Sequence, residues 1–164
     1  RDVAPSRGLG DVYKRQTVAT LVKNVKNIVG LKAASGDLSQ IAKTVSLAGE
    51  DLELYSGNDD QVLPILSLGG LGVISVLSNV APKETHDMVM KFLEGNTKGA
   101  ARIQINAIPL INALFCEVNP IPVKTALNLM GMNVGPLRMP LCEMEEANKE
   151  TLIKAMKDFG IKLA

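Results

Sequence analysis

The stretch NIVGLKAASGDLSQ, Asn27–Gln40, decides the fold. Ile28, Val29 and Leu31 have the apolar character of a buried strand, and this strand ends at Lys32. An ammonium group at the end of a core strand costs free energy unless it is paired, reaches water or works as an uncharged amine. Two interpretations follow. The lysine side chain extends along the surface to solvent, or it is a nucleophilic amine at the mouth of a pocket.

Apolar strands and amphipathic helices alternate on both sides of this stretch. The expected elements are a helix over 17–25, a strand over 28–32, a helix over 38–48, a strand over 52–56, a helix that begins at Asp59 or Asp60, and an apolar strand over 72–78. Strands separated by helices of this length favour βαβ units and a parallel sheet. The predicted fold class is therefore α/β, as a barrel or a doubly wound sheet.

After residue 81 the sequence predicts helices alone. Their apolar positions fall within 88–93, 100–115, 119–131 and 145–160, and the last helix is expected to stop at Gly160. The first sixteen residues, RDVAPSRGLGDVYKRQ, have no helical or strand periodicity and resemble a non-native leader. We therefore expect a leader over 1–16, an α/β part over 17–81 and a helical part over 82–164.

Composition excludes several classes of function. The chain carries 18 basic and 17 acidic residues with 3% aromatic residues, which does not suit a nucleic-acid or membrane-surface protein. No apolar run is long enough to span a membrane. The partner is expected to be a small molecule or another copy of the chain, in the cytoplasm.

The metal-binding and thiol residues are few. Cys116 and Cys142 lack the spacing of a metal site and are expected to be buried free thiols in a reducing compartment. The single histidine, His86, lies among charged residues, so we expect it on a solvated helix face. A site with several histidine ligands is excluded.

Two polar or glycine-rich motifs have simpler structural explanations. The glycines of GGLG, residues 69–72, precede a strand instead of following one, so they predict a tight turn and not a dinucleotide site. The adjacent Asp59 and Asp60 in SGNDD suit acid–base or metal chemistry, but a loop that caps the next helix is the favoured interpretation. Lys32 differs because the carboxyl ends of parallel barrel strands form the catalytic face.

Three motifs together carry a family resemblance. NIVGLKAASGDLSQ resembles the Schiff-base lysine strand of the pyruvate-dependent aldolase superfamily that contains dihydrodipicolinate synthase and N-acetylneuraminate lyase, and is closest to the synthase branch. The similarity continues through LYSGNDDQVLPILSLGGLGVISVLSNVAP and EVNPIPVKTALNLMG, in the same order. It covers nearly all of residues 17–164.

The resemblance implies a fold and a site. The fold is a (β/α)8 barrel with a C-terminal helical extension, of which this chain would hold strands six to eight and the extension. Lys32 falls on the lysine that condenses with pyruvate, and Ile74 on the residue whose backbone lies against bound pyruvate. Gly57 and Asn58 fall on the loop that lines the pocket. No cofactor or metal is implied, because the intermediate is a covalent imine on the lysine.

The sequence departs from the family pattern in two ways. Many members have Glu after the lysine, where this chain has Ala33. The tyrosine proton donor and its threonine–tyrosine relay belong to the first half of the barrel, and neither Tyr13 nor Tyr55 falls on those positions. The resemblance likewise assigns the family's site for feedback inhibition by lysine to the first half of the barrel.

The resemblance implies condensation of pyruvate with aspartate semialdehyde, in lysine and diaminopimelate biosynthesis, by a homotetramer when the barrel is complete. One alternative is a related aldolase that acts on N-acetylneuraminate or a 2-keto-3-deoxy sugar acid. Another is a truncated, non-catalytic fragment.

Overall fold

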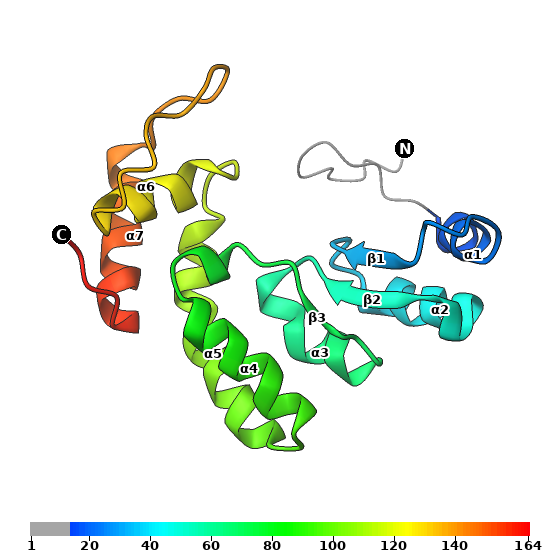
Figure 1. The fold of residues 1–164 in the computed structure, drawn as a ribbon. Coiled ribbons are helices and arrows are strands. Elements are labelled where there is room, and N and C mark those ends of the chain that lie inside the picture. Colours follow the sequence, from blue (N-terminus) through cyan, green and yellow to red (C-terminus); the bar gives the residue numbers. More distant parts are fainter. Residues whose placement is uncertain (1–13) are drawn as a thin grey trace. The chain divides into compact units, whose positions relative to one another are not determined.

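A small parallel β-sheet organises the first part of the chain, in a computed structural model that describes residues 14–164. The strands are β1 (Gly30–Ala33), β2 (Glu53–Ser56) and β3 (Gly72–Val73), ordered β1-β2-β3 with both pairs parallel (Figure 1). The register places Lys32 opposite Tyr55, and Tyr55 opposite Gly72. The parallel α/β arrangement predicted from the sequence is confirmed in these residues.

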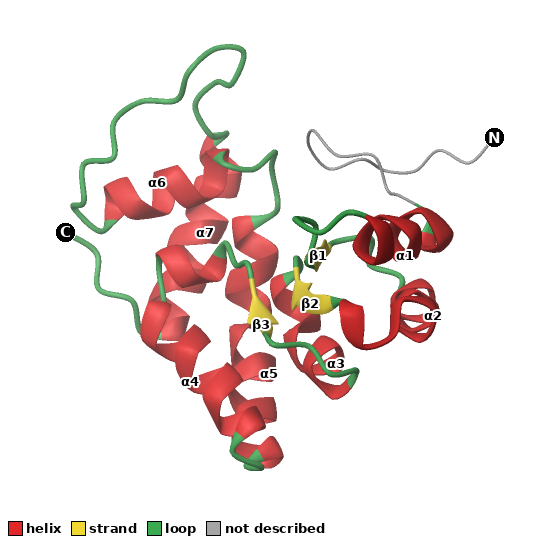
Figure 2. Ribbon diagram, turned by 45° about the vertical axis from the view of Figure 1, so that its right-hand side comes forward, coloured by secondary structure: helices red, strands yellow, loops and turns green. Residues whose placement is uncertain are grey.

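Helices alternate with the strands along the chain: the first precedes β1, and the next two connect β1 to β2 and β2 to β3 (Figure 2). They are α1 (Arg15–Asn24), α2 (Leu38–Ala48) and α3 (Val62–Ser67), with the short 3-10 turns η1 (Gly49–Asp51) and η2 (Asp59–Gln61). Helix α2 has the predicted limits because the Asp37 carboxylate accepts a hydrogen bond from the Gln40 N–H at its start. Helix α1 begins two residues before the predicted start. The prediction of a leader over 1–16 rests mainly on residues outside the described part of the chain.

One face of the sheet is covered by helices. Ala33, Ile41, Leu54 and Ile65 form a buried cluster, against which Leu31, Val45 and Leu68 pack. Side chains alternate between the two faces of a strand, so Lys32 lies on the face opposite to this cluster. The sheet therefore has an apolar face that packs against helices and a second face that carries the lysine.

The third strand is shorter than predicted. It ends at Val73, Ile74 is 49% exposed, and Leu77–Asn79 forms the 3-10 turn η3 in place of a strand. Leu77 is fully buried, but the cluster in which it packs belongs to the second unit. The predicted burial of residues 72–78 is therefore correct for only part of this stretch. The prediction of one continuous strand over 72–78 is wrong.

The chain divides into two compact units at Ser75 and Val76, and the second unit is helical. It contains α4 (Pro82–Leu93), α5 (Thr97–Leu114), α6 (Ile121–Leu129) and α7 (Glu146–Phe159), as predicted. Leu110, Leu114, Ala126, Leu152 and Met156 are fully buried at its core. Helix α7 ends at Gly160, whose φ of 96° is the left-handed conformation that favours glycine.

The two outer strands of the sheet each have a single strand neighbour within residues 14–164. Unpaired strand edges promote association with other chains. We therefore expect the purified 164-residue chain to self-associate and to melt without a sharp cooperative transition. Sedimentation velocity and thermal circular dichroism measure both properties.

A charge on the edge provides the control. Val29 precedes β1 and is 55% exposed, so Val29→Lys should reduce self-association. A monomeric wild-type chain with a sharp melt would contradict the expectation.

Candidate active site

The candidate site begins with Lys32, the third residue of β1. Its side chain is exposed on the face of the sheet away from the helices, and it forms no salt bridge with another residue in 14–164. The cost of burying an ammonium group therefore does not arise within the described chain. The amine stands at the carboxyl end of a parallel strand, the position that the catalytic interpretation required.

Gly57 provides the space beside this lysine. Its N–H donates a hydrogen bond of 2.7 Å to the Ala33 carbonyl, which brings the turn after β2 against the end of β1. A Cβ on Gly57 would lie 2.7 Å from the Ala34 Cβ, closer than real side-chain carbons approach, and 3.0 Å from the Lys32 Cγ, which is an unusually tight contact. The lysine stem and this turn therefore fit together because residue 57 has no side chain.

Asn58 lies in the same turn, half-buried at the start of η2. The buried Ser56 hydroxyl donates a 2.8 Å hydrogen bond to the Asn58 carbonyl and accepts a 3.3 Å bond from the Asn58 N–H. These two bonds fix the backbone of the turn and do not involve the side-chain amide of Asn58. The structure thus brings Gly57 and Asn58 to the carboxyl end of β2, next to the end of β1.

Ile74 follows β3 at the corresponding end of the sheet. Its N–H donates a 2.8 Å hydrogen bond to the Ser56 carbonyl. A Cβ on Gly72 would lie 3.8 Å from the Tyr55 ring, so Gly72 faces the lysine side of the sheet. Alternation then places Ile74 on that side as well. The four predicted residues therefore occupy the same end of one sheet.

Tyr55 is a neighbour that the sequence did not assign to the site. It lies directly opposite Lys32 in the register, and side chains in such a pair point to the same face. Its ring lies over the position that a Gly72 side chain would take. Alternation combined with the parallel register was the signal that would have found it.

The adjacent aspartates do not form a shared carboxylate site. Asp59 is 2% exposed within η2, whereas Asp60 is exposed. Neither occupies the N-cap position of α3, where Gln61 stands. No cluster of three His, Cys, Asp or Glu side chains suited to a metal ion occurs in the described residues.

The cysteines lie in the second unit, and their predicted burial is wrong: Cys116 and Cys142 are both exposed and free. Partial desolvation, and then the charge of Glu117, raise the pKa of the Cys116 thiol. A raised pKa leaves less of the reactive thiolate. His86 lies on a solvated helix face, as predicted, with 70% of its side chain exposed.

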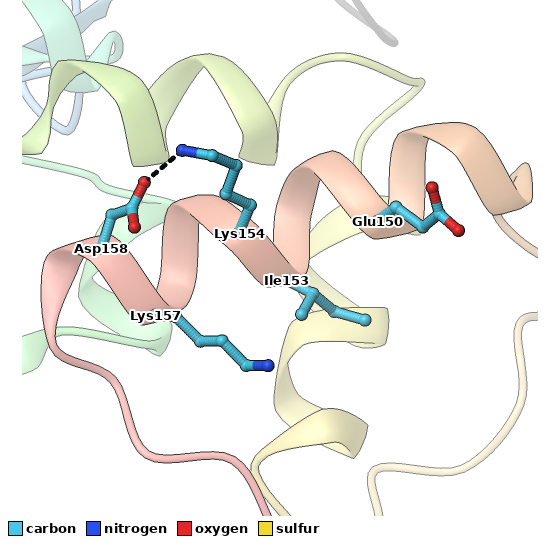
Figure 3. Close-up of a pocket in the computed structure, with 5 residues that line it drawn as sticks. All are labelled: Glu150, Ile153, Lys154, Lys157 and Asp158. Carbon is cyan, nitrogen blue, oxygen red and sulfur yellow. Dashed lines mark hydrogen bonds and ion pairs between the residues drawn. The ribbon is translucent and has the colours of Figure 1, made fainter.

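A shallow hollow in the second unit lies along α7 and is lined by Glu150, Ile153, Lys154, Lys157 and Asp158 (Figure 3). Lys154 donates a 2.7 Å hydrogen bond to Asp158, which raises the pKa of the lysine. All these residues belong to one helix, so they line a helix surface. Over residues 14–164, no helix has the length and apolar character needed to cross a membrane.

The geometry defines a class: an α/β protein with a lysine at the carboxyl end of a parallel strand. The sequence pattern of the Dihydrodipicolinate synthetase family matches residues 4–159, and the chain belongs to this family. A 4-hydroxy-tetrahydrodipicolinate synthase of Lachnoclostridium phytofermentans is 57% identical over 145 residues, 88% of this chain and 49% of that protein. The synthase of Clostridium tetani is 51% identical over 146 residues, 89% of this chain and 50% of that protein.

Solved structures agree. The dihydrodipicolinate synthase of Thermotoga maritima matches with a TM-score of 0.86 at 43% identity, over 90% of this chain and 51% of that one. A further dihydrodipicolinate synthase crystal structure matches with a TM-score of 0.85 at 46% identity, over 90% and 50%. The chain has the fold of part of a (β/α)8 barrel, with strands six to eight and the helical extension. It spans about half the length of the curated relatives it matches.

The close approach at Gly57 generates a prediction for an extended chain, in which the first half of the Lachnoclostridium phytofermentans relative precedes this sequence. Gly57→Ala should lower the free energy of unfolding by about 1–3 kcal/mol, the usual cost of overpacking. Chemical denaturation measures this difference.

Gly72→Ala is the matched control. It adds the same methyl group on the same sheet, but at ordinary contact distance from the Tyr55 ring. Equal losses in the two variants would contradict the assigned role of Gly57.

Proposed function

We propose that this chain supplies the Schiff-base part of a 4-hydroxy-tetrahydrodipicolinate synthase, which condenses pyruvate with aspartate semialdehyde. The observation that carries the proposal is the Lys32 amine at the carboxyl end of β1, which forms no salt bridge within residues 14–164 and lies beside a turn that has no side chain at Gly57. Membership of the family and the names of the curated relatives support it.

The proposed reaction starts with Lys32. Its uncharged amine attacks the C2 carbonyl of pyruvate, and loss of water leaves an imine. The imine withdraws electrons from the methyl group, which loses a proton to give an enamine. The enamine carbon attacks the aldehyde of aspartate semialdehyde, whose oxygen takes up a proton. The substrate's own amine then attacks C2, closes the ring and displaces Lys32 as the free amine.

The other residues of the site would hold pyruvate in place. We assign the Ile74 backbone to one side of pyruvate and the turn at Gly57 and Asn58 to the wall behind it. The hydrogen bonds that fix these backbones keep the pocket in one shape before the substrate arrives, which lowers the cost of ordering it. The chemistry needs no resident metal or organic cofactor, because the imine itself is the electron sink.

The remainder of the machinery is proposed to come from the rest of the barrel. We assign to it the tyrosine proton donor, its relay and most contacts to the second substrate. The complete enzyme is proposed to be a cytoplasmic homotetramer that binds neither nucleic acid nor membrane. The 164-residue chain alone is expected to show no measurable condensation.

Trapping with borohydride tests the nucleophile. In the extended chain, pyruvate plus borohydride should leave a reduced adduct on Lys32, located by peptide mass spectrometry. Lys32→Arg should abolish the adduct, because a guanidinium stays protonated and does not form the imine.

Lys43 and Lys124 serve as internal controls in the same digest. Both are lysines of the same chain that belong to helices, α2 and α6, and not to a strand end. An adduct on either of them in place of Lys32 would overturn the assignment.

The second substrate is tested by comparing two reactions of the extended chain. We expect condensation of pyruvate with aspartate semialdehyde to be at least about a hundredfold more efficient than cleavage of N-acetylneuraminate, a difference of roughly 2.7 kcal/mol in activation free energy. The basis is AASGDL after Lys32, which departs from the lyase pattern. Comparable efficiencies, measured as kcat/KM, would favour a sugar-acid aldolase.

A further inference from the structure

The loop that follows Lys32 lies beside the turn that follows β2, and Gln61 joins the two. The Gln61 side-chain amide donates a 3.0 Å hydrogen bond to the Gly36 carbonyl, across 25 residues of sequence. Gln61 ends η2, the turn that begins directly after Asn58. This side-chain bond joins the loop after β1 to the turn after β2, in addition to the backbone bond from Gly57 to Ala33.

The loop needs such a connection because its own residues hold it weakly. Ala34, Ser35, Gly36 and Asp37 are all exposed and small or polar. Gly36 has a φ of 78°, a region that glycine enters freely, and glycine has the largest conformational entropy to lose. The Asp37 bond to Gln40 fixes the start of α2 and does not reach the turn after β2.

Only one end of the Gln61 side-chain amide forms a hydrogen bond within the described residues. Its nitrogen donates to Gly36, while its oxygen is buried and accepts no hydrogen bond within the described residues. The contribution of the amide is thus concentrated in the bond to the loop. Replacing it with an apolar side chain of the same length removes that bond and leaves the packing nearly unchanged.

We propose that Gln61 is a positioning residue that holds the Ala34–Asp37 loop against the turn at Gly57 and Asn58, and so keeps the pyruvate side of the pocket ready for imine formation at Lys32. The proposal rests on the proposed function for its kinetic consequence. It does not place Gln61 in contact with substrate. Its effect falls on the pyruvate half of the reaction, because that half takes place at Lys32 before the second substrate enters.

Gln61→Met in the extended chain tests this role. It should lower kcat/KM for pyruvate by about two- to tenfold, the range that the net contribution of one neutral hydrogen bond corresponds to. The value of kcat/KM for aspartate semialdehyde should stay unchanged. Gln61→Glu should lower the pyruvate value further, because a carboxylate then faces the Gly36 carbonyl.

Ser67→Ala is the matched control. The Ser67 hydroxyl donates a 2.7 Å bond to the Pro64 carbonyl at the end of α3 that leads to the start of β3. Loss of this hydroxyl should leave kcat/KM for pyruvate and kcat/KM for aspartate semialdehyde at their wild-type values. Equal falls in both ratios for Gln61→Met, or no fall, would overturn the proposal, since a general loss of folded enzyme affects both ratios alike.

Hydrogen exchange separates this proposal from the proposed function. Gln61→Met should speed exchange in the peptide that contains Ser35–Asp37, whatever reaction the protein performs. If wild-type enzyme forms no pyruvate adduct on Lys32, the proposed function fails while the exchange result still decides whether Gln61 holds the loop. Unchanged exchange in that peptide would refute the connection itself.

Discussion

The candidate site depends on one close approach, where the turn after β2 meets the end of β1. The hydrogen bond of 2.7 Å from the Gly57 N–H to the Ala33 carbonyl draws two backbones together and leaves no room for a side chain on residue 57. The Lys32 Cγ lies 3.0 Å from the position that a Cβ on residue 57 would take. The position of the lysine is therefore set by backbone contacts, which vary less than side-chain contacts on an open surface.

One face of the sheet packs against helices, and the other face carries the lysine. Ala33 is buried with Leu54 against helices, while Lys32, its immediate neighbour, is exposed on the opposite face. Alternation along a strand means that the residue that anchors β1 and the residue that bears the amine are separated by one peptide bond. A lysine at the end of an apolar strand is then compatible with a dry core, because the core and the amine lie on different sides.

Local signals in the sequence were sufficient for much of the fold. Helix α2 could be placed because Asp37 caps its start and Gly49 ends it with a φ of 70°. The third strand was overextended because a continuous apolar run does not distinguish a strand from a turn that packs in another core, as Leu77 does. The exposure of the cysteines also escaped prediction, because burial of a loop residue depends on contacts that are distant in sequence.

The candidate site divides in the same way between local and non-local information. Lys32, Gly57, Asn58 and Ile74 follow apolar strands, and the parallel topology brings strand ends to one edge. Tyr55 and Gln61 could be placed near Lys32 only with information that is not local in the sequence. The first needs the register between two strands, and the second needs the distance between two loops separated by 25 residues. Neither quantity is encoded in a short motif.

Ala33, where many members of the family have Glu, is the last residue of β1. Ala33 is 5% exposed and packs in the helix-facing cluster, so replacing the glutamate common in the family alters the side of β1 that faces away from the amine. The small residue that matters to the lysine face is Ala34, whose Cβ would lie 2.7 Å from a side-chain carbon at residue 57. Ala34 and Gly57 are thus a matched pair: any increase in volume at one is constrained by the other. This pairing explains the small residue at position 34, whereas the small residue at position 33 packs in the helix-facing cluster.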